Sequence, residues 1–328
     1  MQRTRKPKYP EITSRDRVRE PLAEYFITKD QLRERLISAE PHEFDEVSSI
    51  VGLLRKTPDK IYEIGKLLGD DDPRVINTMY SIFSTAATHA ECRAQVLYFL
   101  LQKLKDKNFK FRLNALSAFC HIVRNKVNIM PAIPEITDRL RDSYPEIKRV
   151  AAQTLGIMAE SRVNISIAVP SLTKALEDDN GGVRELAILA LYYAVRAGTD
   201  ISIAIDNIAK NLEHHDKSVR HQAVSALCEA SKRGIDVSKA TSNLVKLLSD
   251  SEGQLVSASI STLLNVVQTA DVNTLEIITK EIVEFVGSDW YHSQGERNTD
   301  SYVRAFDAVA TIMSVVGLRM NKEEREVA

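Results

Sequence analysis

Two columns of charged side chains recur along the chain at a spacing that could assemble a row of catalytic or ion-binding groups. The acidic column is Asp70, Asp106, Asp142, Asp178 and Asp250, with His214 in the same register. The basic column follows six positions later, at Arg112, Lys148, Arg184 and Arg220. Carboxylates and cations held together support acid–base chemistry when their pKa values are shifted. Their recurrence every 36 residues favours a structural ladder instead, in which each cation reaches the turn aspartate of its own or the neighbouring repeat.

Other residue types that carry chemistry give weaker signals. His214, His215 and His221 lie close enough in sequence to suggest a metal site, but no cysteine or further histidine falls near them. The Gly181-Gly182 pair lacks the Lys-Ser/Thr that a phosphate-binding loop requires. Nucleophile-elbow, Cys-x-x-Cys and His-Glu-x-x-His motifs are also missing from the sequence. We therefore predict a protein that is not an enzyme and that uses no metal and no other cofactor.

The composition favours an all-α protein. Apolar residues make up 44% of the 328 residues and charged residues 27%, which is typical of a soluble folded chain. Only 12 glycines and 10 prolines occur, fewer than strand-and-turn folds need, and none of the prolines follows Pro170. No apolar run reaches the ~18 residues of a membrane span, and the N-terminus lacks a signal-peptide core. Three widely separated cysteines make no disulfide framework, so we expect a reducing, cytoplasmic location and no membrane contact.

The charge is concentrated at the N-terminus. Residues 1–19 carry seven Lys/Arg against Glu11 and Asp16, a net of +5, while the remainder carries 37 bases and 43 acids, a net of −6. We expect this tail to be disordered and solvated. The alternative is a nucleic-acid contact through its cations, namely Arg3, Arg5, Lys6 and Lys8.

An internal repeat must position all of these side chains. Each unit holds an apolar anchor that precedes the basic column by one residue, and successive anchors are 36 residues apart. The anchors are Val75, Phe111, Ile147, Val183, Val219 and Leu255. From Val183, apolar or small residues recur at +4, +7, +8, +11 and +12, which is the stripe of an amphipathic helix, here helix B of the unit. A shorter helix A precedes it, and its start is marked by the capping column Asn128, Asn164, Asp200 and Asp236. Because neither helix can bury its stripe alone, the pairs must stack.

A proline in helix A, an aspartate eight residues later and a basic residue six after that resemble the HEAT repeat. Pro134, Asp142 and Lys148 show the pattern, and Pro170, Asp178 and Arg184 repeat it. The resemblance covers roughly residues 57–318 and implies an armadillo-like, right-handed α-solenoid of about seven helix pairs. The 36-residue unit is shorter than the ~40–47 residues usual for these repeats, and most units lack the proline.

The resemblance also implies tests for enzymatic relatives. Deoxyhypusine hydroxylases carry iron on repeated His-Glu pairs, whereas His42-Glu43 is the only such pair in this sequence. HEAT-like alkylpurine DNA glycosylases use Trp, Asp and Arg on a basic concave face. Asp289-Trp290 is present but the body is acidic, so this activity stays a remote alternative. We predict a non-catalytic scaffold that binds a protein partner of unknown identity.

The binding surface is expected on the concave face formed by the B helices. Most units place polar or small groups at positions +6 and +10, but two units supply the apolar set Ile157, Leu189, Tyr192 and Tyr193. The alternative is that these side chains have only a structural role and pack against the next repeat. A second candidate is an insertion at 287–300, which holds Trp290, Tyr291 and Arg297. Trp290 is expected either to cap the terminal repeat or to recognise the partner.

The sequence thus divides into four segments. We predict a basic tail (1–19), an N-terminal helical cap (20–56), the solenoid (57–318) with its insertion, and a C-terminal tail (319–328). The helical stripe is expected to resume after the insertion through Phe306, Val309 and Ala310.

Overall fold

The computed structural model describes residues 29–38, 43–250, 252–288 and 300–327. Within these ranges every regular element is an α-helix or a short 3₁₀ turn (η), which confirms the all-α prediction. The chain forms two compact units, residues 1–99 and 100–328. The predicted tail at 1–19 lies outside the described residues.

The first unit contains the helices predicted as the N-terminal cap and the first repeat. Its elements are α1 (Lys29–Ser38), α2 (Glu43–Lys56), η2 (Pro58–Lys60), α3 (Ile61–Ile64), η3 (Gly65–Gly69) and α4 (Pro73–Thr88). Helix α5 (Ala90–Leu104) contains the boundary between the units. Leu32, Ile50 and Leu54 from the first two helices are buried, so α1 and α2 have a true core face.

The second unit is built from long B helices that alternate with short A helices. The B helices are α6 (Phe109–Arg124), α8 (Pro145–Glu160), α10 (Gly181–Arg196), α12 (Lys217–Lys232), α14 (Gly253–Thr269) and α17 (Asp300–Val327). The A helices are α7 (Ile133–Asp138), α9 (Val169–Ala175), α11 (Ile205–Lys210), α13 (Thr241–Lys246) and α15 (Val272–Val286). Short 3₁₀ turns flank most A helices, namely η4 (Met130–Ala132), η5 (Arg139–Arg141), η6 (Ser166–Ala168), η7 (Ser202–Ala204), η8 (Asn211–Glu213), η9 (Ser238–Ala240) and η10 (Leu247–Ser249).

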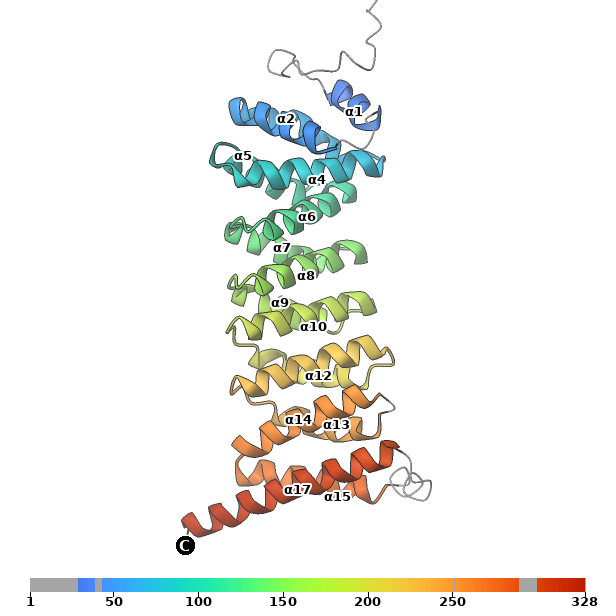
Figure 1. The fold of residues 1–328 in the computed structure, drawn as a ribbon, viewed down its shortest axis with the longest axis vertical. Coiled ribbons are helices and arrows are strands. Elements are labelled where there is room, and N and C mark those ends of the chain that lie inside the picture. Colours follow the sequence, from blue (N-terminus) through green and yellow to red (C-terminus); the bar gives the residue numbers. More distant parts are fainter. Residues whose placement is uncertain (1–28, 39–42, 251, 289–299, 328) are drawn as a thin grey trace, which may run out of the picture. The chain divides into compact units, whose positions relative to one another are not determined.

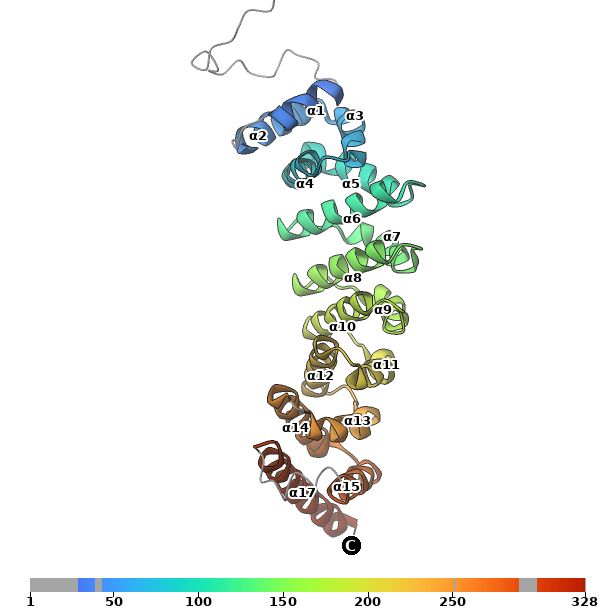
Figure 2. The same ribbon diagram turned by 90° about the vertical axis from the view of Figure 1, so that its right-hand side faces the viewer.

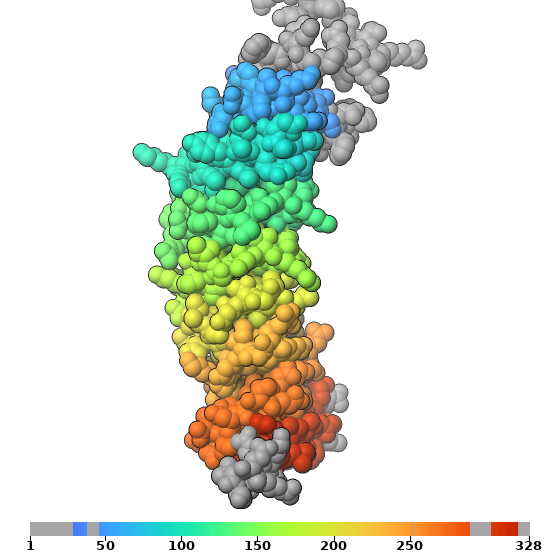
Figure 3. All heavy atoms as spheres, turned by 90° about the vertical axis from the view of Figure 1, so that its left-hand side faces the viewer, coloured from blue at the N-terminus to red at the C-terminus, as the bar shows by residue number. Residues whose placement is uncertain are grey.

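Neighbouring B helices of the second unit pack directly on one another. Figure 1 shows α6, α8, α10 and α12 side by side, and the contacts run in the same order on to α14 and α17. In Figure 2 the A helices α7, α9, α11 and α13 form a separate layer beside the B helices. The space-filling view in Figure 3 shows the atoms of successive repeats of the second unit following one another along this face. This stacking of helix pairs is the α-solenoid arrangement that the repeat predicts.

The apolar anchors lie in the core of the units. Val75, Ile147, Val183, Val219 and Leu255 are buried, and all six stripe positions from Val183 to Val195 are buried on α10. Phe111 is half-buried instead, and its ring lies 4.4 Å from the Lys103 ammonium. At Gly156 a Cβ would lie 3.5 Å from the Ala190 Cα, an ordinary contact distance, so α8 and α10 pack closely here without requiring a glycine.

Turn chemistry repeats with the same register. The predicted capping column is confirmed, because Asn128, Asn164, Asp200 and Asp236 each accept a hydrogen bond from the N–H two residues on, at 2.8–2.9 Å. Each of these bonds leads into a 3₁₀ turn before helix A begins. The turn from helix B to helix A also needs a left-handed residue, with φ of 59° at Lys126, 62° at Arg162, 91° at Gly198 and 77° at Gly234.

Helix α17 departs from the sequence prediction in its buried stripe. Ala305, Ala308, Ile312 and Val316 are buried, whereas Phe306 is 50% exposed and Ala310 is exposed. The predicted stripe is wrong by one residue, because the small Ala305 faces the core where the sequence pattern favours the larger Phe306. The helix continues to Val327, and the Arg319 guanidinium donates to the carbonyl of Ala270 at 2.8 Å.

Candidate functional site

The charged columns form a ladder between repeats of the second unit, as predicted. Arg112 donates to both oxygens of Asp142, at 2.8 Å and 2.9 Å, thirty residues further along the chain. Its Nη1 also donates to the carbonyls of Asp106 and Lys107 in its own turn. The predicted pairing with the aspartate of the neighbouring repeat is therefore the one that forms, and in its own turn the guanidinium binds backbone carbonyls.

The neighbouring rungs follow the same pattern. Lys148 pairs with Asp178, and Arg220 pairs with Asp250 at 3.0 Å. Each aspartate also accepts a backbone hydrogen bond from the residue two positions on, at Tyr144, Asn180 and Glu252. Asp106 has no such partner in the preceding repeat, where Ile76 occupies the basic position, and it pairs with Lys103 at 2.8 Å.

Two of these carboxylates, Asp106 and Asp142, are stabilised in the charged state. Burial alone would raise the pKa of Asp142, but the Arg112 guanidinium and the Tyr144 N–H together hold it below its usual range. Burial likewise opposes the Lys103 ammonium at Asp106, whose pKa is also lowered. Both groups bind a cation and a backbone donor, which accounts for a structural role without any reacting atom.

One rung of the ladder is mismatched. His214 stands where the other turns carry aspartate, and its Nε2 lies against Nη2 of Arg184. Its Nδ1 accepts from the Asp216 N–H at 3.0 Å. A neutral imidazole has one acceptor nitrogen, so Nε2 then carries a hydrogen and offers the guanidinium no lone pair. Burial, followed by the Arg184 charge, lowers the pKa of His214.

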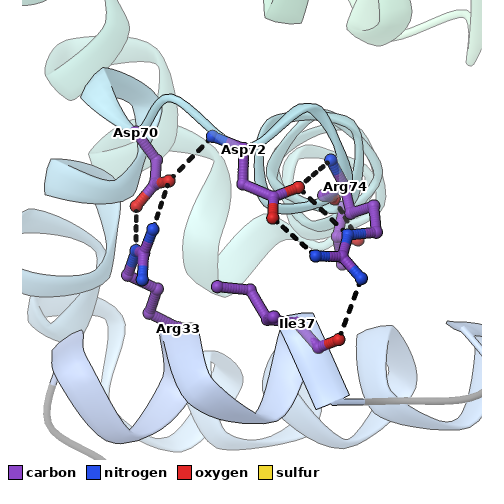
Figure 4. A network of polar contacts seen from close by, with 6 residues as sticks. Arg33, Ile37, Asp70, Asp72 and Arg74 are labelled. Atoms are coloured by element: carbon purple, nitrogen blue, oxygen red, sulfur yellow. Dashed lines mark hydrogen bonds and ion pairs between the residues drawn. The ribbon is translucent and has the colours of Figure 1, made fainter.

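The first unit contains a related network, drawn in Figure 4. Arg33 of α1 donates to both oxygens of Asp70, at 2.6 Å and 3.2 Å, and so takes the place of the ladder cation. Asp72 caps α4 by accepting from the Arg74 N–H at 2.9 Å. The Arg74 side chain returns to Asp72 and also donates to the Ile37 carbonyl at 3.1 Å. These hydrogen bonds with Arg74 lower the pKa of Asp72 to about 2.

The predicted apolar patch lies on the B helices α8 and α10, which pack against each other. We call it the B-face patch. Its members are Ile157, Leu189, Tyr192 and Tyr193, and all four are half-buried. The Tyr192 and Tyr193 ring centroids are 5.3 Å apart, and the Arg196 guanidinium lies 5.6 Å from the Tyr192 centroid. Burial and the neighbouring Glu160 carboxylate raise the pKa of Tyr193.

Several predicted residues lie outside the described part of the chain. They are Trp290, Tyr291 and Arg297 of the insertion and Arg3, Arg5, Lys6 and Lys8 of the tail. Their roles stay predictions from the sequence.

In the described residues no group of three or more His, Cys, Asp or Glu is placed to hold a metal ion. In the same part of the chain, no helix has the length and apolarity to cross a membrane.

The sequence reasoning missed a pair of exposed aromatic rings. Phe109 and Tyr144 stack with their centroids 4.8 Å apart and their planes at 16°, and they are 37% and 43% exposed. They come from the turns that begin α6 and α8. The signal was present in the sequence, because Tyr144 interrupts the column of capping residues Asp72, Asn108, Asn180 and Asp216, although Glu252 at the next step also makes no side-chain cap bond.

Comparison with known proteins supports the solenoid. A family profile for HEAT repeats matches residues 97–192. No curated protein matches the chain significantly. A chain from the structure in which Kap95p binds RanGDP matches 91% of this chain with a TM-score of 0.57 and 15% identity. The match covers 40% of that chain, so the present protein spans less than half of its length.

Two shorter proteins also match. One is a designed armadillo repeat protein in complex with the peptide (KR)4, with 16% identity, a TM-score of 0.48 and coverage of 66% of this chain and 98% of the other. The second is an engineered protein with 20% identity, a TM-score of 0.47 and coverage of 67% and 97%. The stacked helix pairs and the charged ladder make the chain an α-solenoid, and its residues 97–192 are similar to HEAT repeats.

Proposed function

We propose that the protein is a non-catalytic scaffold that binds a protein partner on the B-helix face, with the B-face patch at the centre of the contact. The single observation that carries the proposal is the tyrosine pair of α10 with Arg196 beside it. Tyrosine and arginine are the residue types that contribute most binding energy in protein interfaces.

The packing of α8 against α10 supports this assignment. Ile157 comes from one helix and Leu189 from the next, so the two repeats contribute to one surface. Elsewhere, the position equivalent to Leu189 is a serine, Ser117 on α6 and Ser225 on α12. Half-buried rings lose little side-chain freedom when a partner covers them, which favours affinity.

The comparison with Kap95p supports the general class. In that structure a chain of similar fold belongs to a complex with RanGDP, another protein. The three cysteines Cys92, Cys120 and Cys228 are free, which supports the proposal that the protein is located in a reducing compartment such as the cytoplasm.

The test is partner capture by a double variant, Leu189→Glu with Tyr193→Glu. We expect it to lose the captured protein while its circular dichroism stays helical. The matched control is Ser117→Glu with Ser225→Glu, which places the same charges at equivalent B-face positions outside the patch. Retention of the partner by the patch variant would refute the proposal, and so would an equal loss in the control.

A further inference from the structure

The A-to-B turns of the second unit differ sharply in charge. The segment 103–112 holds five cations against one acid, Asp106. Thirty-six residues on, the segment 139–148 holds three cations against two acids. The next segment, 175–184, is acidic, with one cation against Glu177, Asp178 and Asp179. Positive charge is thus concentrated at two adjacent turns of a protein whose body is acidic overall.

The cations of these two turns include some that the ladder does not use. Lys107 and Arg149 are exposed and make no ion pair with any described residue. Arg141 is exposed and makes one contact with the Ser171 hydroxyl, at 3.4 Å. Lys105 is 64% exposed and pairs with Glu135 at 3.3 Å, a surface pair that contributes little. The acids Asp138 and Glu146 stand among them without such pairs.

The exposed rings of Phe109 and Tyr144 come from the same two turns as these cations. Phe109 is two residues from Lys107, and Tyr144 is three residues from Arg141. The Arg112 guanidinium lies 5.6 Å from the Tyr144 centroid. We call Lys107, Phe109, Arg141 and Tyr144 the basic aromatic patch.

The helix start at Tyr144 shows that this patch forgoes a local stabilisation. Tyr144 occupies the N-cap of α8 and makes no side-chain cap bond, whereas Asn108 and Asn180 cap the helices on either side. A residue that cannot cap leaves the first N–H groups of the helix without a side-chain acceptor, which lowers the stability of the helix. In place of a cap, Tyr144 presents a ring that stacks on Phe109 and stays 43% exposed, so this turn offers an aromatic surface where its neighbours offer a capping group.

We propose that the basic aromatic patch binds single-stranded nucleic acid. Exposed aromatic rings stack on unpaired bases, and the flanking cations neutralise the phosphates. An acidic peptide would use the cations but has no need of two exposed stacked rings, so the rings favour the nucleic acid. This site is separate from the B-face patch and from the N-terminal tail, and it can hold or fail independently of the proposed scaffold function.

The test is fluorescence anisotropy of a labelled single-stranded oligo(U) with the full chain. The double variant Phe109→Lys with Tyr144→Asn copies Lys217 and the capping asparagines of sister repeats, so the helices are expected to form normally. It removes both rings while it raises the positive charge. If bases stack on the rings, affinity falls about 5- to 100-fold despite the added charge.

The cations are tested through the salt dependence. Lys107→Ser with Arg141→Ser should make the slope of log affinity against log salt shallower by about 1.4, at ~0.7 per phosphate contact. The matched control, Lys174→Ser with Lys232→Ser, removes two exposed cations elsewhere and should leave the slope unchanged.

Three results would overturn the proposal. The first is wild-type affinity weaker than the order of 10⁻⁴ M, the weak end of non-specific binding. The second is unchanged or tighter binding by Phe109→Lys with Tyr144→Asn, which would leave only electrostatic attraction. The third is full competition by poly-glutamate with no effect of Tyr144→Asn, which would assign the patch to an acidic protein segment.

Discussion

Arg112 holds Asp142 across the junction of two repeats through two parallel hydrogen bonds, and the Asp142 side chain is 3% exposed. The same guanidinium donates to the carbonyls of Asp106 and Lys107 in its own turn. One side chain therefore joins two turns that have no covalent connection nearer than thirty residues.

Removing this carboxylate should destabilise the fold. We expect Asp142→Ala to lower the free energy of unfolding by about 3 kcal/mol, because it leaves a nearly buried guanidinium without its partner. Arg112→Lys keeps the charge, as Lys148 does one repeat on, and should lose about 1 kcal/mol. Urea unfolding followed by circular dichroism measures both. Equal stability of Asp142→Ala and the wild type would show that the pair contributes nothing.

The same pair predicts a loss of stability in acid. The folded-state pKa of Asp142 lies below its ordinary value of 3.8, so its contribution is present above that value. It is lost as the pH falls from there through the folded-state pKa. Asp142→Asn should flatten this part of the stability curve between about pH 5 and pH 2. A curve of unchanged steepness would contradict the assignment.

The mismatched rung should be repairable. His214→Asp gives Arg184 a carboxylate at the position where Asp142 serves Arg112, so we expect it to raise stability by about 1 kcal/mol at pH 7. His214→Ala is the control, because it removes the imidazole without supplying a carboxylate. Thermal melts of the three proteins measure the effect. A melting temperature of His214→Asp no higher than that of His214→Ala would refute the account of this rung.

His214 also makes the stability of the fold depend on pH, because the folded state disfavours its charged form, whereas it favours the charged form of Asp142. The folded-state pKa of His214 lies below the ordinary 6.5, so the folded protein binds the proton less readily than the unfolded chain. Stability should therefore fall as the pH drops below about 6.5 and level off below the folded-state pKa. His214→Asp should remove this decline, and melts from pH 7 to pH 5 test it.

The left-handed turn column offers a paired test of backbone strain. Gly198→Ala should cost about 1 kcal/mol, because a Cβ is disfavoured at a φ of 91°. Arg162→Gly makes the reverse change at an exposed position with a φ of 62° and should stabilise by a few tenths to 1 kcal/mol. The two substitutions should change the free energy of unfolding in opposite directions. A loss of stability in both variants would contradict this explanation.

In the first unit, Gly65 is expected to tolerate no side chain. A Cβ there would lie 2.4 Å from the Phe99 ring, which is stacked on Phe83 and meets Tyr62 edge-on. Since these neighbours restrain the ring, Gly65→Ala should destabilise by about 1–3 kcal/mol. Gly52→Ala is the control, because nothing lies within 4 Å of its Cβ position.

The repeat register made the core and the ladder predictable from sequence. Val183 and its stripe are buried because a helical period and a fixed repeat length determine which side chains face the next helix. Asp178 and Lys148 could be paired for the same reason, since stacking brings equivalent turns together. The sequence alone did not decide whether a ladder cation binds its own turn or the neighbouring one, because one guanidinium can reach both turns.

Features that break the register were harder to predict. In the sequence Tyr144 resembles an ordinary turn residue. Its ring stacks on Phe109 of another repeat, and sequence spacing does not specify that contact. The stripe of α17 was misplaced by one residue because the insertion removes the 36-residue register that fixed the other helices. The positive φ of Lys126 and Arg162 was hidden because neither is a glycine.

The most direct test of the scaffold account is site-specific photo-crosslinking. A photoreactive residue replaces Tyr193 in the B-face patch or, as a control, Lys174 on the exposed side of α9, and lysates are irradiated with and without nuclease. The account predicts one protein adduct at Tyr193 that resists nuclease and is absent at Lys174. Adducts of equal yield at both positions, or an adduct at Tyr193 that nuclease abolishes, would contradict it.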